Sequence, residues 1–104
     1  MQIYKIDITA DAFKQIQEAY YHIKEQSAPD AERWLSTLYE RVHSLRTMPN
    51  RCGLIREKEA FGQEVRELLH FSHRIIFAVD EERSLVSVHA VRHAARDEMQ
   101  GGKF

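Results

Sequence analysis

In the first residues, apolar side chains occur at every second position. Further along the chain, they occur at every third or fourth position. Tyr4, Ile6 and Ile8 are separated by single polar residues, which predicts a half-buried strand. Thr9 can cap a helix, and after it apolar residues recur every three or four positions, as on one face of a helix. The predicted face consists of Phe13, Ile16, Tyr20 and Ile23.

A second helical stripe follows a short interruption. Ser27, with Asp30 three residues later, resembles a capping box, and Pro29 is tolerated in the first turn of a helix. Pro49 and Gly53 then stop the helix and favour a turn. The apolar face of this predicted helix consists of Ala31, Trp34, Leu35, Leu38, Val42, Leu45 and Met48.

The second half of the chain has the pattern of strands. Segments 64–70 and 73–79 are apolar runs separated by two residues, and segment 84–91 follows the acidic turn "DEER". The order of elements is therefore β-α-α-β-β-β. We expect an α+β fold, in which a helical hairpin covers one face of a mainly antiparallel four-stranded sheet. Residues 1–104 are expected to form a single domain with a flexible tail at about 98–104.

Alternation within the strands predicts which side chains lie on the face that the helices leave open. On the strand 73–79, Ile75, Phe77 and Val79 are expected to face the helices, which turns Arg74 outward. On the last strand the more apolar face consists of Val86, Val88 and Ala90. The opposite, open side is then expected to carry Ser87, His89, Val91 and His93.

Composition and charge exclude several classes of protein. The 104 residues are 43% hydrophobic and 30% charged, which is typical of a soluble globular domain. No apolar run approaches the roughly 18 residues of a membrane span, and the N-terminus lacks a signal-peptide layout, so we expect a cytoplasmic protein. With 15 basic and 16 acidic residues, the chain has no overall basic excess for gripping nucleic acid. A single cysteine, Cys52, excludes an internal disulfide and is interpreted as an incidental thiol in a loop.

The charged cluster at the end of the last strand has two explanations. In the catalytic one, Arg74, His89 and His93 share the open face and supply acid-base groups and a phosphate-stabilising cation. In the structural one, Arg74 and Arg96 pair with Glu67 or Asp97 and hold the sheet edge and the C-terminal segment, and we favour this explanation.

Histidine spacing also raises the question of a metal site. His89 and His93 are four residues apart, a spacing that suits a helix, whereas both are predicted on a strand. We therefore expect neither a metal nor another cofactor.

Several motifs, together with the order of elements, resemble the RelE/ParE superfamily of bacterial toxins, which includes plasmid-stabilisation proteins. The resemblance covers nearly the whole chain and rests on "SAPDAER" at 27–33, the turn at 49–53, "REL" at 66–68, "HRIIF" at 73–77 and "VRHAARD" at 91–97. It implies the toxin of a type II toxin-antitoxin pair, which inhibits growth and is neutralised by a small antitoxin.

The superfamily has two branches, and the resemblance alone leaves the target open. One branch cleaves messenger RNA on the ribosome, and the ParE-like branch inhibits DNA gyrase. Phe77 stands where many relatives have tyrosine, and the tail after Arg96 has neither tyrosine nor histidine. These departures favour the ParE-like branch and a protein that is not an enzyme. An mRNA endonuclease and a non-toxic partner-binding module of the same fold remain as alternatives.

Three sets of candidate residues follow. The candidate target contacts are Arg66, Arg74, Arg92, His93 and Arg96; the candidate nuclease residues are Arg74, His89 and His93; the candidate antitoxin contacts are Tyr20, Tyr21, Trp34 and Tyr39. The antitoxin is expected to fold along the helical hairpin and reach the sheet edge, although a tryptophan such as Trp34 more often lies in a core. The pattern leaves open whether the chain forms a homodimer or only a toxin-antitoxin hetero-oligomer.

Overall fold

The computed structural model describes residues 2–95, apart from the side chain of Lys58. The tail expected at about 98–104 and the candidates Arg96 and Asp97 lie outside the described residues.

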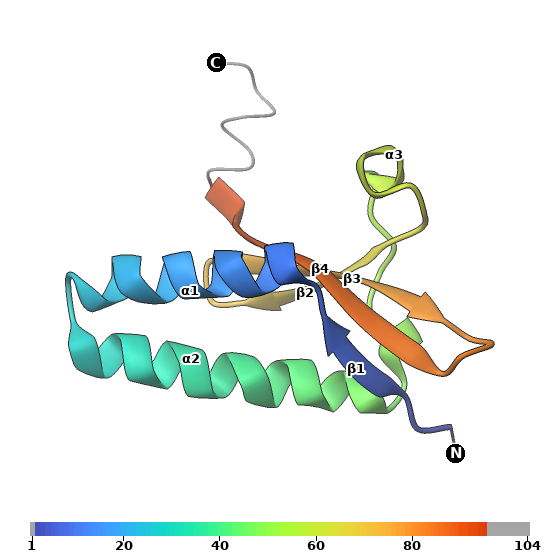
Figure 1. Ribbon diagram of the computed structural model, residues 1–104, viewed down its shortest axis with the longest axis horizontal. Coiled ribbons are helices and arrows are strands. Elements are labelled where there is room, and N and C mark those ends of the chain that lie inside the picture. Colours follow the sequence, from blue (N-terminus) through green and yellow to red (C-terminus); the bar gives the residue numbers. More distant parts are fainter. Residues whose placement is uncertain (1, 96–104) are drawn as a thin grey trace.

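The predicted order of elements is confirmed, with three short helical turns inserted in its middle (Figure 1). The long elements are β1 (Lys5–Ile8), α1 (Ala10–Lys24), α2 (Ala28–His43), β2 (Arg66–His70), β3 (His73–Asp80) and β4 (Leu85–His93). The short turns are the 3-10 helices η1 (Ser44–Arg46) and η2 (Pro49–Arg51) and the four-residue helix α3 (Lys58–Phe61).

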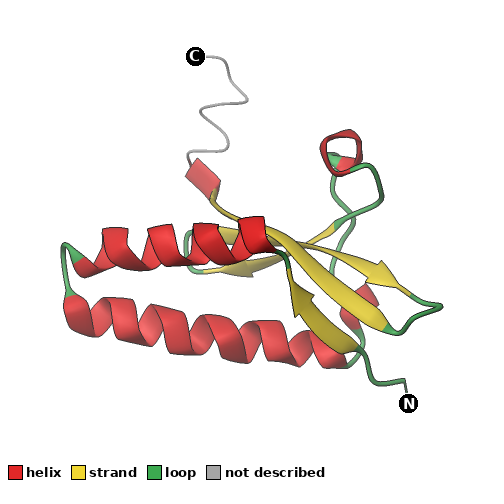
Figure 2. Cartoon of the chain, viewed as in Figure 1, coloured by secondary structure: helices red, strands yellow, loops and turns green. Residues whose placement is uncertain are grey.

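The sheet is mixed, with strand order β1-β4-β3-β2. β1 runs parallel to β4, whereas β4 with β3 and β3 with β2 are antiparallel pairs. Helices α1 and α2 lie side by side as a hairpin, and α3 lies apart from them (Figures 1 and 2). This is the expected α+β architecture.

Both long helices begin at the predicted caps. The Thr9 hydroxyl accepts a hydrogen bond from the backbone N–H of Ala12 at 3.2 Å, and the Ser27 hydroxyl accepts one from Asp30 at 3.3 Å. Each bond satisfies a backbone donor that the first turn of a helix leaves without a partner. The hairpin is therefore specified locally at both helix starts.

The main hydrophobic cluster lies between the hairpin and the sheet. It contains Tyr4, Ala12, Ile16, Ala19, Trp34, Leu38, Val42, Leu45, Cys52, Ile75, Phe77, Val86, Val88 and Val91. Two expected members are missing: Phe13 is 47% exposed and Met48 is 64% exposed. The buried stripe of α1 runs instead through Ala12, Ile16 and Ala19, whose small alanines allow close packing, and Met48 lies beyond α2 in a left-handed conformation. Cys52 is a free thiol in a loop, as expected, and its side chain is buried in this cluster.

A β-bulge changes the faces of β4. Ile76 pairs with Ala90 and Phe77 pairs with Val88, so His89 is an extra residue in the ladder. Before the bulge the prediction holds, because Val86 and Val88 face the helices. After it the prediction is wrong: Val91 and His93 lie on the helix side, and Ala90 lies on the other.

Candidate functional site

A segment of the chain covers part of the face that the helices leave open. This segment, residues 54–64, contains α3 and is called the strap below. Its beginning is held to the sheet by a hydrogen bond of 3.0 Å from the Ile55 N–H to the Val65 carbonyl. Ile55 and Phe61 pack on a second, smaller cluster formed by Val65, Ile76, Ala78 and Ala90. The open face therefore has its own apolar core beneath the strap.

Arg74 lies on this face and is bound by two carboxylates. Its guanidinium donates to Glu67 of β2 at 2.5 Å and lies 2.8 Å from a carboxylate oxygen of Glu57 in the strap. Only 15% of the Arg74 side chain is exposed. Burial alone lowers the pKa of Arg74, but the hydrogen bonds and attraction of Glu67 and Glu57 outweigh it, so the pKa is raised. Arg74 is charged at every relevant pH, and its charge is balanced within the protein.

His89 and Arg92 lie on the same face and contact the strap through one aromatic ring. The Phe61 ring lies 5.3 Å from the Arg92 guanidinium and 6.1 Å from the His89 imidazole. Gln63 lies 3.4 Å from His89 Nε2. Arg92 thus makes a cation-π contact, and within residues 2–95 it forms no ion pair of the kind that Arg74 makes with Glu57 and Glu67.

His93 lies at a different place, in a pocket between the hairpin and the β2-β3 turn. This histidine pocket has a volume of about 570 Å³ and is lined by His22, Ile23, Gln26, Trp34, Phe71, Ser72, His73 and His93. The rings of His73 and His93 are 5.1 Å apart, and those of Trp34 and His73 are also 5.1 Å apart. Of the three residues expected together on the open face, Arg74 and His89 lie on that face and His93 does not.

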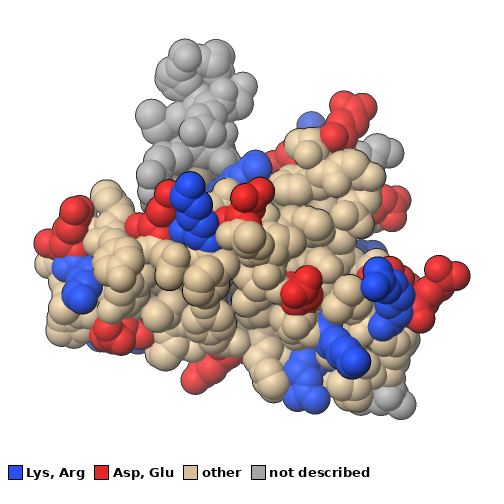
Figure 3. Space-filling view, viewed as in Figure 1, with Lys and Arg blue, Asp and Glu red and all other residues tan. Residues whose placement is uncertain are grey.

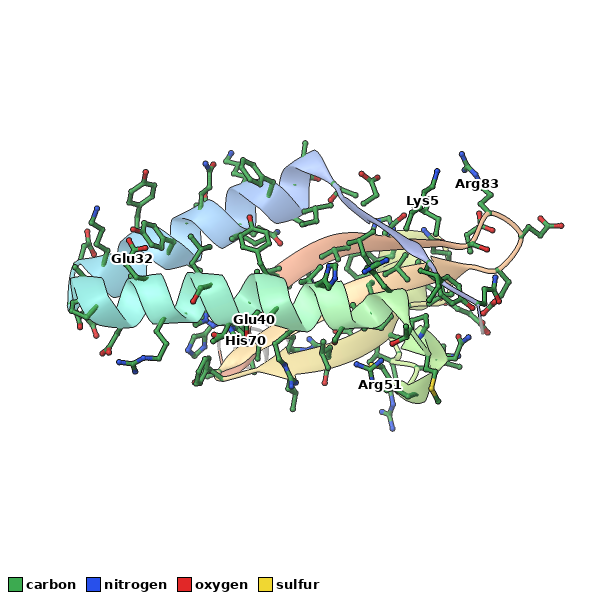
Figure 4. The ribbon with its side chains drawn as sticks, turned by 90° about the horizontal axis from the view of Figure 1, so that it is seen from below. Lys5, Glu32, Glu40, Arg51, His70 and Arg83 are labelled. Atoms are coloured by element: carbon green, nitrogen blue, oxygen red, sulfur yellow. The ribbon has the colours of Figure 1, made fainter. Side chains whose placement is uncertain are left out.

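His70 lies beside the same tryptophan but is buried. Its Nε2 is 3.0 Å from the Trp34 carbonyl oxygen, and the residue is 3% exposed. Burial lowers the pKa of His70, the hydrogen bond to Trp34 opposes this shift, and the positive charge of Arg41 adds to it. Figure 4 shows His70 against α2. His70 therefore joins the sheet to the hairpin in its neutral form.

The remaining candidates, Arg66 and the aromatic residues of the hairpin, differ in how far they are buried and in what they bind. Arg66 donates to the carbonyl oxygens of Cys52 and Asn50, which is a structural role. Trp34 is buried at 5% exposure, whereas Tyr21 and Tyr39 are 60% and 38% exposed. The Tyr20 hydroxyl donates to Glu32, and this hydrogen bond, with desolvation and the negative charge of Glu32, raises the pKa of Tyr20. Glu32 lies on the surface of α2 (Figure 4).

Sequence reasoning missed the strap residues that complete the open face: Glu57, Phe61 and Gln63. The apolar residues Ile55 and Phe61 within a mainly charged and polar stretch were the available signal that this stretch packs on the sheet. Which sheet residues it meets depends on the tertiary structure.

Neither a metal-binding cluster nor a membrane-spanning helix is present within the part of the chain that the structure describes. It holds no group of three or more histidine, cysteine or acidic residues arranged to bind a metal ion. None of its helices has the length and apolar character needed to cross a bilayer.

Comparison with solved structures supports the fold. A chromosomal ParDE toxin-antitoxin system from P. aeruginosa contains a chain that is 20% identical, with a TM-score of 0.69 over 89% of this chain and 98% of that one. The toxin-antitoxin complex RelBE2 from Mycobacterium tuberculosis contains a chain that is 22% identical, with a TM-score of 0.63 over 89% and 93%. At these identities the similarity establishes the architecture alone.

Sequence comparison identifies the family. A search of curated proteins gave no match. The family model described as the ParE toxin of the type II toxin-antitoxin system, parDE, matches residues 6–98, which include every strand and helix described above except the first residue of β1. The chain therefore belongs to the ParE toxin family of type II toxin-antitoxin systems.

Proposed function

We propose that this chain inhibits bacterial growth by acting on DNA gyrase, and that a small antitoxin encoded beside it neutralises the effect. Membership of the ParE family is the starting point for this proposal. The geometry of the open face favours a gyrase inhibitor over a nuclease.

The observation that carries the proposal is the pairing of Arg74 with Glu57 and Glu67. An RNA-cleaving site needs a cation that is available to the phosphate as negative charge develops on it. Arg74 is already bound by two carboxylates, and a phosphate approaching it would be repelled by them. His93, the candidate acid-base group, lies on the helix side of the sheet. These placements support a toxin that acts by binding its target.

Arg92 is then the candidate target contact with the strongest support. It lies on the same face as Arg74, and its described contact is with the Phe61 ring rather than a carboxylate. Charged groups at the rim of a protein interface increase the association rate and fix the orientation of the partner. Arg92 would act in this way toward an acidic surface of gyrase.

One observation favours the ribosome-dependent endonuclease as a second candidate. His89 and Arg92 lie around the same Phe61 ring, so an imidazole and a cation are close together on the open face. An imidazole beside a cation can serve as a general acid or base near a phosphate. This candidate makes His89, rather than His93, the residue to test.

The two candidates separate in paired assays on purified protein. Gyrase supercoiling and DNA cleavage are measured in parallel with primer extension on a translated messenger, using wild type, Arg92→Ala, His89→Ala and Arg83→Ala. Arg83 is an exposed arginine in the β3-β4 turn and provides the matched control (Figure 4). Circular dichroism confirms that each variant is folded.

For a gyrase inhibitor, Arg92→Ala should weaken inhibition about tenfold, corresponding to about 1.4 kcal/mol of binding free energy. His89→Ala and Arg83→Ala should leave inhibition close to that of wild type. Cuts in the messenger that disappear in folded His89→Ala, with gyrase unaffected, would instead establish the endonuclease. No effect of wild type on gyrase, messenger or growth would identify a non-toxic binding module.

The antitoxin is proposed to bind the hairpin through its exposed aromatic residues. Tyr21 and Phe13 of α1 and Tyr39 of α2 are all more than a third exposed, although they are large and apolar. Aromatic residues are enriched at the centres of protein interfaces. Size-exclusion chromatography of this chain with the product of the adjacent gene should give a stable complex, which Tyr21→Ala and Tyr39→Ala weaken.

A further inference from the structure

We propose that the histidine pocket binds a carboxylate side chain of a partner polypeptide, an Asp or Glu flanked by apolar residues. This inference rests on the proposed antitoxin partnership and names the chemistry of one of its contacts. It concerns a place on the molecule that is separate from both the open face and the exposed tyrosines.

The pocket lies where three parts of the fold meet. The end of α1 contributes His22 and Ile23, the α1-α2 turn contributes Gln26, and α2 contributes Trp34. The β2-β3 turn contributes Phe71 and Ser72, and the ends of β3 and β4 contribute His73 and His93. A volume of about 570 Å³ accommodates a side chain together with part of a neighbouring one.

Two nitrogen atoms of the pocket residues are shielded from solvent and have no hydrogen-bond partner among the described residues. They are Trp34 Nε1 and His93 Nδ1. An indole N–H is only a donor, and a protonated imidazole donates from both nitrogens. Buried donors without partners are rare in native proteins, because a group removed from water loses its hydrogen bonds there. Trp34 Nε1 therefore requires an acceptor, and so does His93 Nδ1 in the tautomer that carries its proton there. A carboxylate carries two acceptor oxygens.

The charge of the pocket favours an anion over a cation. The lining residues that the structure describes include three histidines and no carboxylate. A lysine or arginine entering the pocket would bring further donors and find no negative charge. A carboxylate would instead accept hydrogen bonds from the imidazole and indole N–H groups of the lining.

The rim of the pocket explains why the acidic residue should have an apolar neighbour. Phe71 is 70% exposed and lies beside Ile23 in the lining. Phe71 sits in the two-residue turn between β2 and β3 with a φ of 54°, a left-handed backbone conformation. An apolar residue next to the partner's carboxylate would pack on this exposed ring.

The test uses the full-length chain and, as the partner, the full-length product of the adjacent gene. Affinity is measured by calorimetry, and Trp34 fluorescence reports on the pocket because Trp34 is the single tryptophan of the protein. The variants are His93→Phe, which removes both ring nitrogens, and His93→Asn, which keeps an amide N–H near the position of Nδ1. His43→Phe is the matched control, since His43 is exposed at the end of α2.

We expect His93→Phe to weaken binding about tenfold or more, His93→Asn to restore part of the affinity, and His43→Phe to have no effect. Individual Asp→Asn and Glu→Gln changes in the partner should identify one carboxylate whose loss has the same effect as His93→Phe. The two losses should not add in the double variant, as expected for groups in contact.

Other outcomes overturn the inference. If the complex still forms and His93→Phe binds the partner as tightly as His43→Phe does, the pocket is not part of the interface. The proposed antitoxin partnership would still stand. Failure to form any complex would overturn both. The Asp97→Asn, Glu98→Gln double variant is measured without the partner. If its Trp34 fluorescence differs from that of wild type, the carboxylate in the pocket comes from the chain's own C-terminal segment and not from a partner.

Discussion

His70 shows how burial determines the state of a single titratable residue. Its imidazole is packed 5.7 Å from the Trp34 ring, and its Nε2 donates to the Trp34 carbonyl oxygen. Desolvation penalises the charged imidazole, so the pKa lies below the ordinary value of 6.5. The folded protein therefore resists protonation that the unfolded chain accepts.

The first prediction concerns the pH dependence of stability. As the pH falls below about 6.5, the unfolded chain binds a proton at His70 before the folded protein does, so the free energy of unfolding decreases. This contribution is fully present above the unfolded pKa and is lost as the pH falls toward and through the lower folded pKa. His70→Gln keeps an N–H donor but does not titrate, so urea unfolding from pH 8 to pH 5 should show a smaller loss.

The control for this prediction is His43→Gln at an exposed position. Its stability should follow that of wild type across the same pH range. Parallel curves for His70→Gln and wild type would show that the burial of His70 has no thermodynamic effect.

At the level of elements, the strap is attached to the sheet by a few specific contacts. Glu57 binds Arg74, Gln63 lies beside His89, and Phe61 packs on the smaller cluster and on Arg92. The α3 helix within it has four residues, too short to be stable by itself. The strap is therefore ordered by its tertiary contacts, of which Phe61 supplies the largest apolar surface.

The second prediction follows from this attachment. Phe61→Ala should cost about 1–2 kcal/mol of global stability, because the ring is only partly buried. Amide hydrogen exchange in segment 54–64 should become faster by a larger factor than exchange in β3. In the variant, local opening of the strap no longer has to expose the apolar Phe61 ring to water, so it costs less free energy. Phe13→Ala on the exposed side of α1 is the control. Equal acceleration in both segments would mean that the strap and sheet unfold together.

The whole molecule is organised around a sheet with apolar clusters on both faces. The larger cluster lies under the hairpin and the smaller one lies under the strap. On the outside, basic and acidic side chains are interspersed over the face shown in Figure 3, in keeping with the net charge of −1. Because the cluster under the hairpin has more buried members than the cluster under the strap, we expect the hairpin side to contribute more to the free energy of unfolding.

The third prediction tests this division. Leu38 of α2 is fully buried in the larger cluster, so Leu38→Ala should cost about 2–5 kcal/mol in urea unfolding. Leu54→Ala at the start of the strap, where the leucine is 54% exposed, should cost less than about 1 kcal/mol. Similar losses for the two variants would contradict a core concentrated under the hairpin.

Most of the secondary structure was predictable from the sequence because its signals are local. The caps at Thr9 and Ser27 act within one helical turn, and the outward orientation of Arg74 follows from alternation along an unbroken strand. The motifs that resemble the RelE/ParE superfamily led to the same family as the sequence comparison.

The arrangement of the candidate sites was decided by the tertiary structure. The bulge at His89 arises from the pairing of β4 with β3, and a single extra residue reverses the faces of every residue after it. His93 consequently meets Trp34 in the pocket instead of joining Arg74. Glu57 and Phe61 reach Arg74 and Arg92 only because the strap folds back across the sheet. Alternation along one segment cannot specify such contacts, because they depend on the register and path of other segments.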